Sequence, residues 1–127
     1  MSEQIRVIVV KPGRYAHIED IDSGLASYQN VVGGYIDQYT PYDDDIAFVI
    51  REEDRDLRRN PNRAIIQEGR ICDILCGTFF ICGLGEEEYA SLTDEQCEKY
   101  LKMFYFPERF ENTYNGVLRF ITNKEMC

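Results

Sequence analysis

The sequence from Ile71 to Cys82 limits the possible folds more than any other part of the chain. It is nearly continuous in apolar residues and is enriched in β-branched and aromatic side chains. Such a run is typical of a strand buried on both faces, which requires a sheet covered on each side. Gly77 interrupts the run, and a glycine inside a strand marks a β-bulge or the close approach of another backbone or a ligand. The run therefore predicts the central strand of a covered sheet.

Shorter segments predict the remaining elements. Apolar or alternating patterns predict strands over residues 5–10, 15–19, 35–39, 46–50 and 117–122. A helix over residues 24–32 would be capped by Ser23 and ended by Gly33 in the left-handed conformation. A second helix begins at the capping box of Thr93 and Gln96, runs to about Phe104 and is stopped by Pro107.

The middle of the chain is harder to interpret. The charged residues 51–60 predict a hairpin turn or a short irregular segment, and Asn62 is a competent N-cap for a short helix within residues 60–67. Residues 1–127 contain no linker or repeat, so they predict one compact domain. Its fold class is α+β, with a mixed, mostly antiparallel sheet and two helices.

The net charge of -9 is unevenly distributed along the chain. Residues 1–50 carry eight acids and three bases, and residues 71–127 carry ten acids and five bases, so each segment has a charge of -5. Residues 51–70 carry five acids and six bases, which gives +1 and defines a basic island of Arg51, Arg55, Arg58, Arg59, Arg63 and Arg70. The excess of acids argues against direct nucleic-acid binding over a broad face. It favours either simple solubility or attraction to a basic partner.

Composition also indicates where in the cell the protein is expected. There is no apolar run near the ~20 residues of a membrane span, and the N-terminus lacks the basic region of a signal peptide. The odd count of five cysteines does not predict a disulfide scaffold. On one strand, Cys72, Cys76 and Cys82 would share a face, with the first two about 13 Å apart, too far for one zinc ion. We therefore expect a cytoplasmic protein with small buried cysteines and no metal.

No pattern in the sequence indicates catalysis. His17 is the one histidine, and no Ser or Cys nucleophile lies near it in the sequence. Dinucleotide, Walker, HExxH and GxSxG patterns do not occur, so no cofactor is expected. The carboxylate runs at residues 43–45 and 86–88 lack EF-hand spacing and are interpreted as solvated turns. The prediction is a protein that is not an enzyme.

The basic island supplies the candidate binding site. The side chains of Arg58, Arg59 and Arg63 flank Asn60 and Asn62, so their donors could converge on a phosphate or carboxylate. The alternative is that the asparagines shape a turn while the arginines pair with Glu52, Glu53, Asp54 and Asp56. A tyrosine could stack on a base, and the interrupted strand could contact a ligand. These interpretations complete the candidate set with Tyr35, Tyr39, Gly77 and Thr78.

Several short blocks resemble one known family. In order they are Val9–Gly13 (VVKPG), Val32–Ile36 (VGGYI), Asn60–Ala64 (NPNRA), Gly77–Gly83 (GTFFICG) and Ser91–Thr93. Their order and spacing are similar to those of domain-of-unknown-function family 3846, which is common in phages and mobile elements, over about residues 5–110. One member resembles a type II anti-CRISPR inhibitor of Cas9, which implies a role in counter-defence. The resemblance assigns no binding residues.

Two functions follow as expectations. In the first, the protein inhibits a host defence protein, a Cas9-type nuclease, by stoichiometric binding in the bacterial cytosol. In the second, it is a sponge that sequesters a cyclic nucleotide or ADP-ribose signal without cleaving it, and such a sponge could act as a homo-oligomer. A nucleotide-cleaving enzyme and a host-takeover adaptor are further alternatives.

Overall fold

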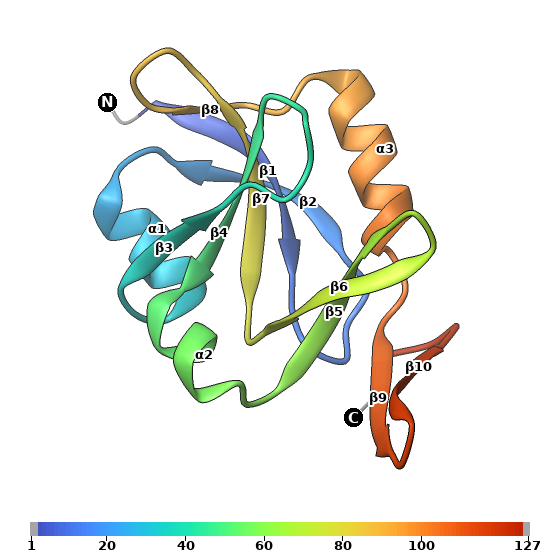
Figure 1. Cartoon of the computed structure of the whole chain (residues 1–127). Helices are drawn as coiled ribbons and strands as arrows, with labels where there is room; N and C mark the ends of the chain where they lie inside the picture. The colour runs from blue at the N-terminus through green and yellow to red at the C-terminus, as the bar shows by residue number, and fades with distance from the viewer. Residues whose placement is uncertain (1–2, 126–127) are drawn as a thin grey trace.

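The computed structural model describes residues 3–125 and is built around one antiparallel sheet (Figure 1). The strand order is β2-β1-β7-β4-β3, and a sixth strand, β8, pairs with the end of β7. The sequence-predicted α+β class is confirmed, because every strand pair in residues 3–125 is antiparallel. The strands of this sheet are β1 (Gln4–Val10), β2 (His17–Asp22), β3 (Ile36–Tyr39), β4 (Ile46–Arg51), β7 (Phe79–Leu84) and β8 (Tyr89–Ala90).

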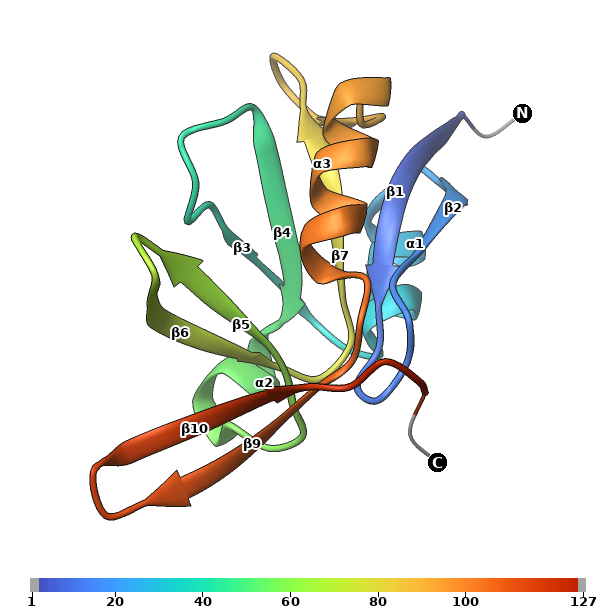
Figure 2. The ribbon, with the colours of Figure 1, turned by 90° about the vertical axis from the view of Figure 1, so that its right-hand side faces the viewer.

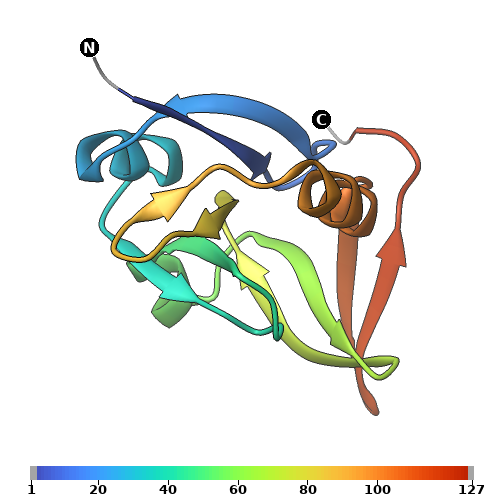
Figure 3. The ribbon, with the colours of Figure 1, turned by 90° about the horizontal axis from the view of Figure 1, so that it is seen from above.

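Both faces of the sheet are covered, as the central apolar run predicts. Helix α1 (Leu25–Val32) covers one face, and helix α3 (Asp94–Phe104) covers the other together with a hairpin of β5 (Pro61–Gln67) and β6 (Arg70–Cys76), as Figure 3 shows. Alternate residues of each central strand enter opposite cores. Phe79 and Ile81 of β7 lie in the core under α3, whereas Phe80 and Cys82 lie in the core under α1.

The observed caps of the helices match the predicted caps in part. Thr93 caps α3 in the expected capping box, since its hydroxyl accepts from the Gln96 amide and the Gln96 side chain accepts from the Thr93 amide. Gly33 ends α1 with φ 83°, also as expected. The predicted cap by Ser23 is wrong, because the N-cap is Gly24 and no side chain caps that end. A short third helix, α2 (Glu52–Leu57), occupies the segment expected to be irregular.

The predicted helix within residues 60–67 is wrong, because this segment is strand β5. Asn62 does not cap a helix; its side chain is buried and donates to the carbonyls of Val10 and Gly77. Ala64 and Ile65 are buried as well. Asparagine is favoured at N-caps through a local hydrogen bond, but here distant backbone carbonyls take its donors.

The predicted single strand over residues 71–82 is two strands that belong to different sheets. Gly77 has φ 73°, a left-handed conformation that ends β6, and β7 begins only two residues later. The cysteines therefore do not share one strand face. Cys72 is exposed, which corrects the expectation of a buried residue, while Cys76 and Cys82 are buried.

The C-terminal part of residues 3–125 contains a second hairpin, of β9 (Glu108–Thr113) and β10 (Gly116–Ile121). Only the second of these strands was predicted, over residues 117–122, because β9 is rich in polar residues and has little strand signal. The predicted strand over residues 15–19 is observed slightly later, as β2. No helix within residues 3–125 is both long enough and apolar enough to cross a membrane.

Candidate functional site

Arg63, a member of the predicted binding loop, is fully buried, and its donors are used inside the protein. Its Nε donates to the Phe104 carbonyl at 2.9 Å, and its Nη2 donates to the Arg14 carbonyl at 2.6 Å. Its Nη1 donates to the carbonyl and to the side-chain oxygen of Asn62. Burial lowers the pKa of the guanidinium to about 10, and nearby Glu108 opposes the shift. The side chain thus stays charged at neutral pH and serves as a structural cross-link.

Asn62 is the second buried member of the predicted loop. Its amide nitrogen donates to the Val10 carbonyl at 3.0 Å and to the Gly77 carbonyl at 2.8 Å. These bonds tie β5 to the end of β1 and to the link that leads into β7. Neither Asn62 nor Arg63 has a free donor directed at solvent, so the structure removes both from a surface anion site.

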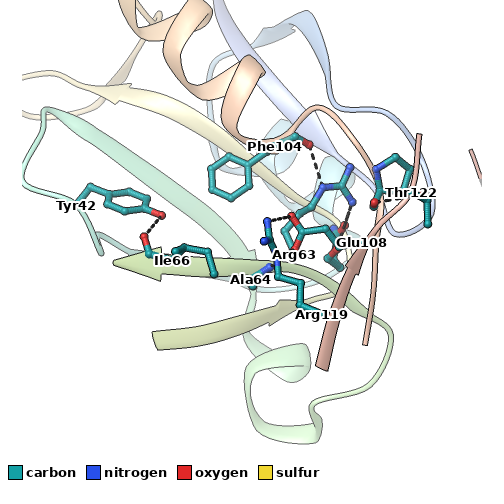
Figure 4. A network of polar contacts seen from close by, with 10 residues as sticks. Tyr42, Arg63, Ala64, Ile66, Phe104, Glu108, Arg119 and Thr122 are labelled. Carbon is teal, nitrogen blue, oxygen red and sulfur yellow. Dashed lines mark hydrogen bonds and ion pairs between the residues drawn. The ribbon is translucent and has the colours of Figure 1, made fainter. Parts of the chain in front are cut away.

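Glu108 completes this internal network and was not singled out by the sequence. It is almost fully buried, its Oε1 accepts from the Ala64 amide at 2.9 Å, and Arg119 donates to both of its carboxylate oxygens. Figure 4 shows Arg63, Phe104, Glu108 and Arg119 gathered at the junction of β5 and β9. No local pattern marks the role of Glu108, because its partners lie 44 residues before and 11 residues after it.

Gly77 and Thr78 form the link between β6 and β7. The Gly77 amide donates to the Asn60 carbonyl at 2.9 Å, and the carboxylate of Asp54 lies where a side chain at position 77 would begin. Glycine is therefore required here, because a side chain of α2 approaches the backbone closely. The group that approaches Gly77 is thus the Asp54 side chain, whereas the sequence predicts a β-bulge or the approach of another backbone or a ligand. Thr78 is half-buried in the same link.

Three of the six arginines of the basic island are paired with carboxylates. Arg51 bonds to Asp54 at 2.9 Å, whereas none of the three arginines near Asn60 and Asn62 is paired with an acid of residues 52–56. Arg55 pairs with Asp37 of β3, and Arg58 lies 3.3 Å from Asp73 of β6, so these two partners come from different sheets. Within residues 3–125, Arg59 and Arg70 have no ion-pair partner. Arg58, Arg59 and Asn60 are exposed on the surface, and of these Arg59 and Asn60 are not engaged in an ion pair.

The two candidate tyrosines do not meet at a common site. Tyr39 shares a small recess of about 20 Å³ with Arg58 and Asp73, a volume too small for a nucleotide. Burial, and then the charge of Asp73, raise the pKa of Tyr39. Tyr35 lies largely exposed in a separate groove beside Arg51. The structure therefore does not assemble the predicted nine-residue set into one pocket.

A different hollow combines an apolar wall with a charged rim. This cavity, of about 510 Å³, lies between the start of α1 and the loop that joins β7 to β8. Tyr89 donates its hydroxyl to Gln38 at 2.8 Å on one side. Burial raises the pKa of Tyr89 to about 12, so the hydroxyl remains protonated at neutral pH. The wall includes Leu25, Tyr28, Ile36, Leu84 and Tyr89, and the rim is Glu86, Glu87 and Glu88.

The cavity opens at a strongly acidic end of the molecule. The β3–β4 loop, the β7–β8 loop and the first turn of α3 lie at the same end of the sheet in Figures 1 and 2. Backbone and side-chain bonds connect them: the Leu84 amide donates to the Asp45 carbonyl, and the Tyr100 hydroxyl donates to Asp44. We call this surface the acidic end; its exposed or half-exposed carboxylates are Glu3, Asp22, Asp43, Asp44, Asp45, Glu86, Glu87, Glu88, Asp94 and Glu95.

Few cations offset this charge. Arg6 pairs with Asp94 at 3.1 Å and Lys99 lies 4.0 Å from Asp44, whereas residues 86–88 have no ion-pair partner in the described chain. No group of three or more His, Cys, Asp or Glu side chains between residues 3 and 125 is arranged to hold a metal ion. The acidic end therefore presents uncompensated negative charge beside an apolar cavity.

Comparison with known proteins identifies the family. Residues 5–105 match the family described as "Domain of unknown function (DUF3846)". The chain belongs to this family. The matched DUF3846 region contains the main sheet, the β5–β6 hairpin and all three helices, and it ends before the β9–β10 hairpin. No curated protein and no solved structure matches the chain.

Proposed function

We propose that this DUF3846 protein acts in counter-defence by binding a host protein stoichiometrically through its acidic end. The partner that we propose is a nucleic-acid-binding defence nuclease of the Cas9 type, whose basic channel normally holds a nucleic-acid duplex. The observation that carries the proposal is the convergence of ten carboxylates on one end of the sheet, with residues 86–88 unpaired beside the cavity. Such a surface is attracted to the cationic channel and competes there with nucleic acid.

The cavity adds a contact of defined chemistry. A lysine or arginine side chain has an apolar stem and a charged head. Its stem would pack on Tyr28 and Leu84, and its head would reach the carboxylates of the rim. The tyrosine rings also favour a cation through their π faces. A basic side chain of the partner is thus the occupant that best fits both the wall and the rim.

The second candidate, a nucleotide sponge, has less support. Two of its proposed phosphate donors, Asn62 and Arg63, are buried in the internal network, and Arg58 is paired with Asp73. Arg59 and Asn60 remain as exposed donors, but they line neither the recess at Tyr39, nor the groove at Tyr35, nor the cavity at Tyr89. A shift of the melting temperature with a cyclic or ADP-ribose nucleotide, absent in Arg59→Met, would favour this candidate instead.

The test is inhibition of DNA cleavage by a purified Cas9–guide RNA complex. We expect the protein to reduce cleavage at equimolar ratio and its affinity to fall as salt concentration rises, because the contact is electrostatic. Changing Glu86, Glu87 and Glu88 together to glutamine should weaken binding by roughly tenfold, since each exposed charge contributes modestly.

A matched control removes charge from another part of the surface. Glu52→Gln with Asp56→Asn changes two exposed carboxylates of α2, which lies away from the acidic end (Figure 1). This variant should bind nearly as well as the parent protein. Absence of any complex, or equal weakening by both variants, would refute the proposal.

A further inference from the structure

The β9–β10 hairpin projects from the body of the protein and exposes apolar side chains on both of its faces (Figure 2). Leu118 is 50% exposed and Ile121 is 58% exposed, and successive residues of a strand point to opposite faces. Val117, Phe120 and the tip residue Tyr114 are exposed as well. An isolated two-stranded hairpin is at best marginally stable in water. This hairpin is bonded to β5 at its base, but these apolar side chains remain exposed in the described chain.

The outer edge of β10 has the properties of a pairing surface. Among the strands of residues 3–125 it pairs with β9 alone, so the backbone groups along its other side have no strand partner there. The outer strands of the main sheet carry carboxylates that discourage pairing, such as Asp20 on β2 and Asp37 on β3. β10 carries no acid, lysine or proline, and its one charged side chain, Arg119, is paired with Glu108.

The charge distribution indicates which partner suits this edge. The hairpin is neutral, because Glu108 and Glu111 balance Arg109 and Arg119, and each acid is paired with an arginine of the hairpin. The whole chain has a net charge of -9, so two copies repel each other at most other surfaces. Contact at the hairpin joins two copies without burying an unpaired charge and keeps their acidic ends apart.

We propose that two copies of the chain dimerise through β10, which pairs antiparallel with β10 of the second copy. The product is a four-stranded sheet in the order β9-β10-β10-β9, with a two-fold axis through its centre. Such an interface is self-complementary and closed, so it forms dimers rather than fibres. It lies outside the DUF3846 match and is independent of the acidic end.

The hairpin is attached firmly enough to serve as an arm. The Thr122 amide donates to the Pro107 carbonyl and closes its base. Glu108 bonds to the Ala64 amide, while Tyr15 donates its hydroxyl to the Asn123 carbonyl on the other side. Both strands are thus fixed where they leave the body, and the apolar edge is held in one place.

Sedimentation equilibrium of the full chain over a range of concentrations tests the proposal. We expect a species of twice 14.9 kDa. Leu118→Lys places a charge on the edge and opposite Glu111, with which it can pair, so the hairpin persists while the dimer dissociation constant rises roughly tenfold or more. Ile18→Lys is the matched control, because Ile18 is similarly exposed, at 45%, on the outer strand β2.

Hydrogen exchange gives a second readout that does not depend on a substitution. Amides of residues 116–121 that face the outer edge should become protected as protein concentration rises, while those of β2 should not change. A monomer at every concentration, or dissociation by Ile18→Lys and not by Leu118→Lys, would overturn the proposal. Neither result bears on inhibition through the acidic end, which is measured separately.

Discussion

Arg63 shows how a single residue can have opposite interpretations in sequence and in structure. An arginine beside two asparagines and a proline is typical of a polar surface loop. Its actual partners are the carbonyls of Phe104 and Arg14, which are 41 and 49 residues away. The local sequence has no signal for these contacts. The sequence shows which polar side chains this segment contains. It does not show where they point, because their direction depends on chain segments that meet only in the folded protein.

Replacement of Arg63 should therefore affect stability rather than binding. Arg63→Met leaves the buried Phe104 carbonyl and the partly buried Arg14 carbonyl without this donor, and we expect a loss of roughly 2–4 kcal/mol in the free energy of unfolding. Urea unfolding measures this loss. Arg59→Met, in the same segment but exposed, should leave the unfolding curve unchanged. Equal stability of the two variants would show that the buried network contributes little.

At the scale of elements, the sequence predicts best where the signals are local. The capping box of α3, the glycine end of α1 and the continuous apolar run of the central strand depend on neighbours in the chain, and the cap, the glycine end and the burial of β7 on both faces are observed. The boundary between β6 and β7 was missed because the apolar pattern continues through it. The two strands are separated by the link of Gly77 and Thr78, in which Gly77 has the left-handed conformation.

The two predicted helix caps offer a direct contrast. Thr93→Ala should lower the free energy of unfolding by about 1 kcal/mol, because the Gln96 amide loses its acceptor. Ser23→Ala should have almost no effect, because the Ser23 side chain does not cap α1. Thermal unfolding of the two variants in parallel measures the difference. A larger loss from Ser23→Ala would contradict the observed N-cap at Gly24.

At the scale of the whole molecule, the sequence reveals the amount of charge but not where it gathers. The runs at residues 43–45 and 86–88 were each interpreted as an isolated turn. The antiparallel order of the sheet places the two loops at the same end, next to the start of α3. The arginines of the basic island, in contrast, do not form one positive surface, because Arg55 pairs with Asp37 and Arg58 pairs with Asp73. The candidate binding surface is therefore the acidic end and not the arginines of the basic island.

The stability of the acidic end should depend on pH. The Tyr100 hydroxyl donates to Asp44 at 2.7 Å, and this bond keeps the pKa of the Asp44 carboxyl below its ordinary value. The folded pKa is the lower one, so the bond's contribution is complete above the unfolded value of about 4. It is lost as pH falls through the folded value.

Tyr100→Phe measures that contribution. At neutral pH we expect the free energy of unfolding to fall by about 1–2 kcal/mol, and the gap between variant and parent to narrow below about pH 4. Denaturant unfolding across this pH range gives the profile. Tyr114→Phe, at the fully exposed tip of the hairpin, should follow the parent protein. If the difference in free energy of unfolding between variant and parent stays constant with pH, the bond between Tyr100 and Asp44 does not depend on the ionisation of Asp44.

The position of Glu108 has a mechanical consequence. It connects the projecting arm to β5, and Asn62 connects β5 to β1 and to the entry into β7. A torque on the arm is therefore transmitted into the middle of the main sheet instead of being absorbed by a loop. In a pair of molecules joined at their arms, the two charged surfaces would keep a constant separation. A bivalent target would gain avidity only if its own two docking points had the same spacing.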